Sequence, residues 1–214
     1  MRKIPTIERR VIPSEVETRT KGEGRIVIAG YAYKFHARSQ NLGGFKETIL
    51  EGAGKDSIER DDIRALKNHD ANLILGRNRA GTLRLSEDST GLEYEIDADE
   101  RQSYVRDLLI SLERGDVTQS SFGFQVMPNG EEWTRDEDDF PLRSIRALSL
   151  FDVSPVTYPA YLSSESKVDK RAIDYAASLV SEVRQAEPIR IPHPDDRDNL
   201  RYLAERARIM KLRG

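Results

Sequence analysis

Residues 25–33 read Arg-Ile-Val-Ile-Ala-Gly-Tyr-Ala-Tyr, a run rich in β-branched and aromatic side chains. Such side chains fit the half-buried surface of a sheet, so this run predicts a strand. Similar alternating or continuous apolar runs recur downstream, at residues 63–68, 82–85, 92–96, 120–126 and 143–156. Turn-forming pairs such as Gly43-Gly44 and Asn129-Gly130 stand between them. The chain therefore predicts a mostly β domain built from short strands.

One clear helix interrupts the predicted strands. Within residues 101–114, apolar side chains recur at helical spacing, at Tyr104, Val105, Leu108, Leu109 and Leu112. Gly115 follows, where a C-terminal cap belongs. A shorter helix is expected at residues 55–60. Together these elements predict an α+β fold, a strongly bent sheet or barrel with at least one amphipathic helix.

The chain is polar for its length, and the charge is unevenly distributed. Charged residues make up 33% of the 214 residues, where about 25% is usual. Residues 1–24 hold six basic and four acidic side chains and residues 165–214 hold eleven and nine, whereas residues 25–164 hold 17 and 24. We therefore divide the chain into an N-terminal extension (1–24), one acidic folded domain (25–164) and a polar C-terminal tail (165–214).

The C-terminal tail contains two candidate helices, at residues 172–184 and 198–213. Pro188, Pro192 and Pro194 separate them, and proline interrupts a helix because it lacks the N–H and clashes with the preceding turn. The tail is therefore expected to be helical or flexible. Two interpretations stay open: a solvated helix, or a docking element for a larger assembly.

The composition excludes several classes of protein and site. No cysteine is present, which excludes disulfide frameworks, cysteine zinc sites and thiol nucleophiles. With only His36, His69 and His193, a histidine-rich metal site is disfavoured, and no cofactor is expected. No apolar run approaches the ~20 residues of a membrane span, and residues 1–13 lack the apolar segment of a signal peptide. We expect a soluble intracellular protein with no membrane partner.

His69 and the pair Ser120-Ser121 are the first candidates for chemistry. His69 follows a predicted strand, at the start of a loop, where a lone histidine is more often structural than catalytic. Ser121 begins an apolar strand and stands two residues before Gly123, a small residue that lets another group approach closely. The alternative is that both serines are ordinary strand-edge hydroxyls.

Asp152 is the third candidate. It lies in a long apolar strand, where a carboxylate is costly to bury without a partner. Strand alternation places Leu150 on its side, which disfavours a simple exposed position. A serine needs an adjacent base, histidine has a suitable pKa, and a carboxylate fixes the imidazole tautomer. His69, Ser121 and Asp152 together therefore make a serine-protease set.

Short motifs occur in a fixed order over residues 25–161. They are Ala29-Gly30-Tyr31-Ala32, Asn41-Leu42-Gly43-Gly44-Phe45 with Glu47, Asn68-His69-Asp70, Leu75-Gly76-Arg77, Gly81-Thr82-Leu83-Arg84-Leu85, Gly91-Leu92, Arg114-Gly115-Asp116, Ser121-Phe122-Gly123-Phe124, Asp152-Val153-Ser154-Pro155-Val156-Thr157 and Pro159-Ala160-Tyr161. In this order they resemble the prohead proteases of tailed bacteriophages, capsid-maturation serine peptidases distantly akin to herpesvirus assemblin.

The resemblance implies a herpesvirus-protease-like fold and a role for each candidate. It makes His69 the general base and Ser121 the nucleophile, because the family serine directly precedes the Phe-Gly-Phe-like triplet. Asp152 falls where the family carries an acidic residue and is taken as the third member. Herpesvirus proteases use a second histidine there, but the only later one, His193, lies beyond the proline-rich break. Gly54 departs from the family, which often has a bulky apolar residue at that position.

The resemblance also implies proteolysis inside an assembling prohead, in the cytoplasm of the host bacterium. The implied substrates are the scaffolding segment of the major capsid protein and the protease itself, with homo-oligomerisation open. Oxyanion donors are expected to be backbone N–H groups or an arginine, for which Arg143 and Arg146 are candidates.

Two function classes compete with the protease. The first is a non-catalytic capsid assembly or scaffolding protein that uses the β domain as a binding module. The second is a nucleic-acid binder, which the basic end of the C-terminal tail favours. The acidic domain disfavours that second class, because phosphate binding needs a broad positive surface.

Overall fold

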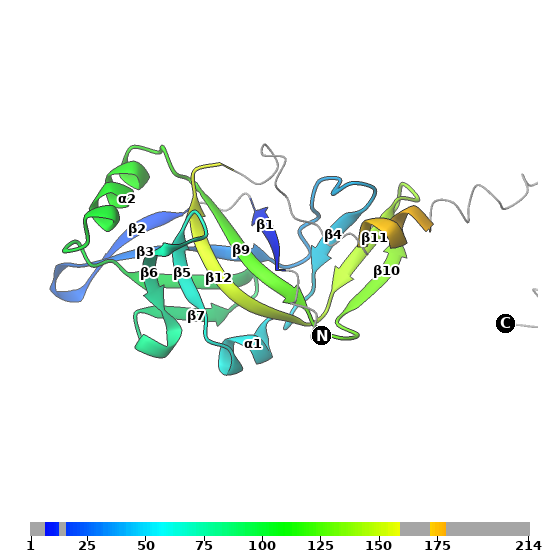
Figure 1. Cartoon of the computed structure of the whole chain (residues 1–214), viewed down its shortest axis with the longest axis horizontal. Helices are drawn as coiled ribbons and strands as arrows, with labels where there is room; N and C mark the ends of the chain where they lie inside the picture. The colour runs from blue at the N-terminus through cyan, green and yellow to red at the C-terminus, as the bar shows by residue number, and fades with distance from the viewer. Residues whose placement is uncertain (1–6, 13–15, 159–171, 179–214) are drawn as a thin grey trace, which may run out of the picture. The chain divides into compact units, whose positions relative to one another are not determined.

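The structure is a computed structural model that describes residues 7–12, 16–158 and 172–178 (Figure 1). Strands dominate these residues, as the sequence predicts, and helices α1 and α2 lie between strands. Within the described residues, no helix is long and apolar enough to cross a membrane. The predicted α+β class is therefore confirmed.

The strands form three sheets. The first has the order β1-β9-β12-β5-β6 and consists of Glu8–Ile12, Gln119–Val126, Leu148–Val156, Arg64–Lys67 and Asp70–Arg77. The second has the order β2-β3-β8-β7 and consists of Glu17–Lys21, Arg25–Lys34, Gly91–Asp97 and Leu83–Glu87. The third has the order β10-β11-β4 and consists of Glu131–Arg135, Pro141–Ile145 and Lys46–Ile49. Figure 1 shows β9 and β12 side by side, with β1 on the outer edge of β9.

The first and second sheets share one hydrophobic core. Phe122 and Phe124 of β9 pack in it with Tyr33 of β3 and Tyr94 of β8, and all four side chains are fully buried. The rings of Phe122 and Tyr33 meet edge-on, with centroids 5.2 Å apart. Burying a side chain of this size stabilises the fold by about 1.5–3 kcal/mol. Because side chains alternate along a strand, the other face of β9 is left for Ser121 and the residues around it.

Both helices between the strands lie where the sequence predicts them. Helix α1 spans Lys55–Arg60, and helix α2 spans Ser103–Glu113. Val105 and Leu108 of α2 are buried in the main core, which explains its apolar stripe. Gly115 adopts a φ of 77°, and its N–H donates to the carbonyl of Leu112, so it ends the helix as expected.

The apolar run at residues 143–156 forms two strands rather than the one that the sequence suggests. Strand β11 ends at Ile145 and strand β12 begins at Leu148. Between them, the N–H groups of Arg146 and Ala147 both donate to the carbonyl of Gly130, at 2.7 and 3.1 Å. The chain thereby passes from the third sheet into the first, a change of partner that the apolar pattern does not reveal.

Strands β1 and β2 lie within residues 1–24, which the sequence sets apart as an extension. The structure pairs β1 antiparallel with β9 and β2 antiparallel with β3. Strand β1 cannot be recognised from an apolar pattern, because its buried side chains include Glu8 and Arg10, which are charged. These charges are matched by ion pairs rather than left in water.

The tail is described over a short part of its length. Residues 172–178 are helical, and Ala172 and Ala176 pack with Leu42 and Phe45 in a small second cluster. The remainder of the candidate helix at 172–184 and the whole of the one at 198–213 lie outside the described residues.

Candidate active site

His69 lies at the tip of a hairpin between β5 and β6, not at the start of an open loop. Lys67 pairs with Asp70, so Asn68 and His69 form a two-residue turn, and both have positive φ, 55° and 57°. This is the combination that a type I′ hairpin turn requires. Asn68 anchors the turn, because its side chain exchanges two hydrogen bonds with Thr157, at 3.1 and 2.8 Å. The imidazole is therefore carried by a tightly held turn.

Ser120 and Ser121 point to opposite faces of β9. The Ser120 hydroxyl donates to the Tyr94 hydroxyl at 2.9 Å, on the core side. Ser121 lies on the other face, opposite Ser154 of β12 in the antiparallel register. Burial raises the pKa of the Tyr94 phenol, so this partner of Ser120 stays protonated. Of the two serines, Ser121 is the one placed beside His69.

Asp152 reaches the face of Ser121 through a β-bulge. The register of β12 against β9 shifts between Leu150 and Asp152, so that Leu150 pairs with Phe124 and Asp152 pairs with Gly123. The expectation that Leu150 and Asp152 share a side is therefore wrong, because the extra residue, Phe151, reverses the alternation. Leu150 enters the core, while Asp152 lies on the polar side with its side chain 10% exposed.

The structure brings the three predicted residues into one hydrogen-bonded line. The Nδ1 atom of His69 lies 2.5 Å from Oδ2 of Asp152, and its Nε2 atom lies 2.6 Å from Oγ of Ser121. Both distances are short for hydrogen bonds between nitrogen and oxygen. A carboxylate, an imidazole and a hydroxyl in this order can activate the hydroxyl as a nucleophile.

Ser154 is a member of this site that the sequence analysis missed. Its hydroxyl donates to Oδ2 of Asp152 at 3.0 Å and accepts the backbone N–H of His69 at 3.3 Å. It thus holds both the carboxylate and the turn that carries the imidazole. Its spacing of two from Asp152, on one strand face, is the signal that could have identified it.

Gly123 leaves the space that the Asp152 carboxylate fills. A Cβ atom at this position would lie 2.5 Å from Oδ1 of Asp152. The sequence predicts that a small residue here admits a backbone or a substrate. The structure shows instead that it admits the aspartate side chain from the neighbouring strand.

Neither arginine proposed as an oxyanion donor is available for that role. Arg143 is buried, and its three side-chain nitrogens bind Glu131, Glu8 and Glu47. Burial opposes its charge, but these carboxylates raise the pKa of its guanidinium. Arg146 is half exposed and forms an ion pair with Glu132. These ion pairs of Arg143 and Arg146 could not be predicted from the sequence, because all the partners are distant along the chain or on another strand.

At Gly54, the departure from the family pattern has a local explanation. A Cβ atom there would lie 2.0 Å from the hydroxyl oxygen of Tyr33. That hydroxyl and the N–H of Gly54 both donate to Oε1 of Glu87, at 2.9 and 3.2 Å. The tyrosine therefore occupies the volume that a larger residue would need.

The described residues contain no cluster of three or more histidine, aspartate or glutamate side chains that could hold a metal ion. His193 lies outside the described residues.

Comparison with known proteins gives one match. The family model described as caudovirus prohead serine protease matches residues 14–178, a span that includes His69, Ser121 and Asp152. No curated protein and no solved structure matches the chain. The match covers well over half of the sequence, and its serine-protease description agrees with the arrangement of hydroxyl, imidazole and carboxylate. The chain belongs to the caudovirus prohead serine protease family.

Proposed function

We propose that this chain is a serine endopeptidase with Ser121 as nucleophile, His69 as general base and Asp152 as the residue that orients His69. The line of two hydrogen bonds from Asp152 through His69 to Ser121 carries the proposal. Prohead proteases act in capsid maturation, so the family supports the reaction class, and the geometry supports the roles.

The proposed reaction passes through an acyl-enzyme. The Ser121 oxygen attacks the carbonyl carbon of a peptide bond while Nε2 of His69 takes the hydroxyl proton. Asp152 accepts the Nδ1–H of His69 and stabilises the imidazolium that forms. The carbon–nitrogen bond then breaks, and His69 protonates the leaving amine. Water, activated by the same imidazole, hydrolyses the ester and restores Ser121.

The proposed substrates are the scaffolding segment of the major capsid protein and the protease itself. Both would be met inside an assembling prohead in the host bacterial cell. The family match supports action on capsid proteins in that compartment. Confinement in a shell brings enzyme and substrate together at high effective concentration, which favours cleavage between chains of the same particle.

The test compares the wild type with Ser121→Ala and Ser120→Ala. We expect a serine-directed fluorophosphonate to label the wild type and Ser120→Ala, and self-cleavage to occur in both. Ser121→Ala should show neither, because the residual activity of a triad without its serine is lower by about 10⁶-fold. Ser120 is the matched control, since its hydroxyl binds Tyr94 on the other face of the same strand.

Two results would reject the proposed roles. Equal self-cleavage by wild type and Ser121→Ala would remove Ser121 from the chemistry. Absence of labelling and cleavage in a folded wild type, together with normal particle assembly, would instead favour the non-catalytic assembly protein.

A further inference from the structure

Strand β1 lies directly against the candidate nucleophile. In the antiparallel register, Arg10 pairs with Phe122 and Val11 pairs with Ser121. The Ser121 hydroxyl lies 2.9 Å from the carbonyl oxygen of Arg10 and is also within reach of His69. Ser121 has no solvent exposure in this arrangement. Strand β1 thus covers the hydroxyl of Ser121, the proposed nucleophile.

The placement of β1 is that of an extended peptide bound to a protease. It adds to the edge of the sheet beside β9, as peptides do when they are recognised through backbone pairing. The carbonyl carbon of Arg10 is one bond, about 1.2 Å, from an oxygen that already contacts Ser121. The peptide bond between Arg10 and Val11 is therefore the bond nearest to the nucleophile.

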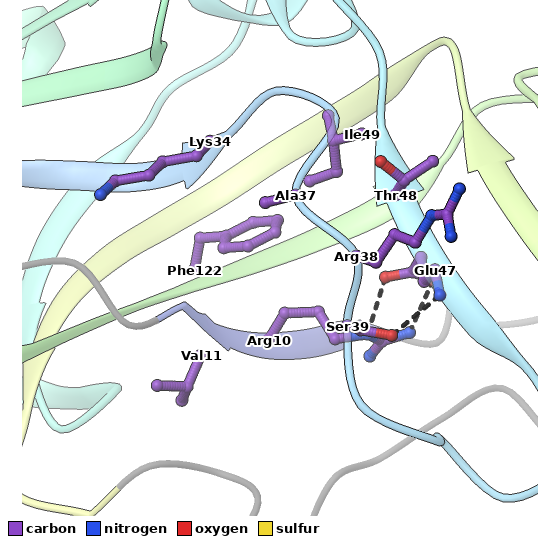
Figure 2. A pocket seen from close by; sticks show the side chains of 10 residues that line it. All are labelled: Arg10, Val11, Lys34, Ala37, Arg38, Ser39, Glu47, Thr48, Ile49 and Phe122. Carbon is purple, nitrogen blue, oxygen red and sulfur yellow. Dashed lines mark hydrogen bonds and ion pairs between the residues drawn. The ribbon is translucent and has the colours of Figure 1, made fainter.

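The side chain of Arg10 is recognised by a carboxylate from another sheet. Its Nε and Nη2 atoms donate to the two oxygens of Glu47, at 2.8 and 3.0 Å, and Glu8 accepts a further bond from Nη2 at 2.6 Å. Figure 2 shows Arg10 reaching Glu47 beside the ring of Phe122. Glu47 has a side-chain exposure of only 3%. A buried carboxylate with bidentate geometry favours arginine strongly over a neutral side chain.

Two hollows adjoin β1 and extend this surface. One pocket of about 60 Å³ lies beside Val11, Phe122 and Thr48 (Figure 2). Thr48 Oγ1 is buried there and, within the described part of the chain, lacks a hydrogen-bond partner. A larger hollow of about 530 Å³ begins at Glu8 and continues past the end of β1 along Gln125 to Asn129. The groove is thus longer than the five residues of β1 that occupy it.

We infer that β1 occupies the substrate groove of the protease, that Arg10 marks the residue on the acyl side of the cleaved bond, and that Glu47 selects a basic side chain there. This inference rests on the proposed function of Ser121. The substrates are then extended peptides with arginine or lysine immediately before the cut. While it is seated, β1 competes with them and keeps the site covered.

Self-cleavage of the Arg10–Val11 bond would uncover Ser121. Ser121 attacks the Arg10 carbonyl carbon, the bond to the Val11 nitrogen breaks, and His69 transfers the proton to that nitrogen. Hydrolysis of the ester leaves residues 1–10 with a carboxylate at Arg10 and a new N-terminus at Val11. Before cleavage β1 is tethered at roughly millimolar effective concentration, and afterwards the released segment can diffuse away.

The first test uses a synthetic peptide with the sequence of residues 5–16. The wild type should cut it between the arginine and the valine that correspond to Arg10 and Val11. Replacing the arginine at position 10 by methionine should slow cleavage by at least about 100-fold, because Glu47 loses the bidentate one of its two arginine partners. Replacing the same arginine by lysine should slow cleavage far less, since the ammonium keeps a positive charge for Glu47.

The second test displaces β1 in the full chain. Arg10→Glu places like charges at Glu47 and should speed fluorophosphonate labelling of Ser121 by about tenfold, through loss of the tethered competitor. Arg101→Glu makes the same change of charge at a side chain that is 90% exposed, and it should label at the wild-type rate. If Arg10→Glu fails to fold, as judged by circular dichroism, the peptide comparison on the wild type decides the question.

The outcomes separate this inference from the proposed function. If Ser121 is labelled but both peptides are cut equally, at another bond, or not at all, the assignment of β1 and Glu47 is wrong and the protease stands. Equal labelling of folded Arg10→Glu and Arg101→Glu also overturns it. If no variant is labelled and no peptide is cut, the proposed function itself fails.

Discussion

Gly123 shows how one atom can decide the placement of the candidate triad. The Cβ atom of an alanine at position 123 would lie 2.5 Å from Oδ1 of Asp152. Because this oxygen belongs to a side chain, the Asp152 carboxylate is the group that would move. We therefore expect Gly123→Ala to fold but to displace the carboxylate from His69. A misplacement of this size should lower kcat by about 10²–10⁴-fold. Peptide cleavage and a thermal melt of the same sample measure the two effects separately.

Gly22→Ala is the matched control for this substitution. A Cβ atom at Gly22 would have nothing within 4 Å, so activity and stability should stay near wild type. If Gly123→Ala retains full activity, the Asp152 carboxylate has room to move without loss, and its position is less critical than the two hydrogen bonds suggest.

The sequence identifies the candidate residues better than it identifies their support. Chemistry and the family resemblance point to His69, Ser121 and Asp152, and the structure places the three together. The bulge that turns Asp152 toward them is not visible in an apolar run, because it depends on how β12 pairs with β9, a strand from an earlier part of the chain. Ser154 lies beyond the bulge, and its spacing of two from Asp152 is the sequence signal that points to it.

Helix α1 holds strand β12 just before that bulge. Asp61, at the C-terminal end of the helix, accepts hydrogen bonds from Ser57 and Ser149, both at 2.7 Å. The Ser57 hydroxyl in turn accepts the N–H of Leu150 at 2.7 Å. These bonds fix the residues that precede Asp152, so the helix contributes to the site without touching it.

The stability of this connection should depend on pH. The hydrogen bond from Arg60, together with those from Ser149 and Ser57, outweighs burial and lowers the pKa of Asp61 to about 2. Because the folded pKa lies below the unfolded value of about 3.9, the stabilisation is complete above about pH 4 and is lost as the pH falls toward 2. Asp61→Asn should cost about 1–3 kcal/mol at pH 7 and little near pH 2, as measured by urea unfolding across this range.

Asp62 provides the control for Asp61. Its pKa is also lowered to about 2, through hydrogen bonds from Arg77 and the charge of Arg64, but its side chain is 39% exposed and is bound by these two arginines. Asp62→Asn should therefore change the unfolding free energy less than Asp61→Asn at pH 7. Equal losses of unfolding free energy would mean that removing any carboxylate bound to arginine has this effect, and that the connection to β12 does not explain it.

The sequence predicts best the strands and helices that have a long apolar pattern. Strand β3, strand β8 and helix α2 lie within a few residues of their predicted bounds, because their apolar faces are buried in the main core. Strands β1, β2, β4, β6 and β10 were missed, and of these β1 and β10 are rich in charge. Their burial and pairing depend on partners that lie on other strands, which a linear pattern does not contain.

Across the whole described domain, a buried cluster of charges joins two sheets. Glu8 and Arg10 belong to β1 in the first sheet, whereas Glu47 and Arg143 belong to β4 and β11 in the third. Burial alone would raise the pKa of Glu8, but the charges of Arg10 and Arg143 lower it below its ordinary value. All four side chains are at most 4% exposed, so each depends on its neighbours to remain charged.

Removing one member should therefore cost far more than removing an exposed ion pair. Arg143→Met leaves Glu8 and Glu47 short of a buried counter-charge, and we expect a loss of about 3–5 kcal/mol, or roughly 10 °C in Tm. Arg146→Met breaks the pair with Glu132, whose members are about half exposed, and should cost no more than about 1 kcal/mol. Calorimetry of the two variants at pH 7 makes the comparison. A similar small loss in both would mean that water or Arg10 compensates the two glutamates, and that the first and third sheets are held together chiefly by apolar contacts.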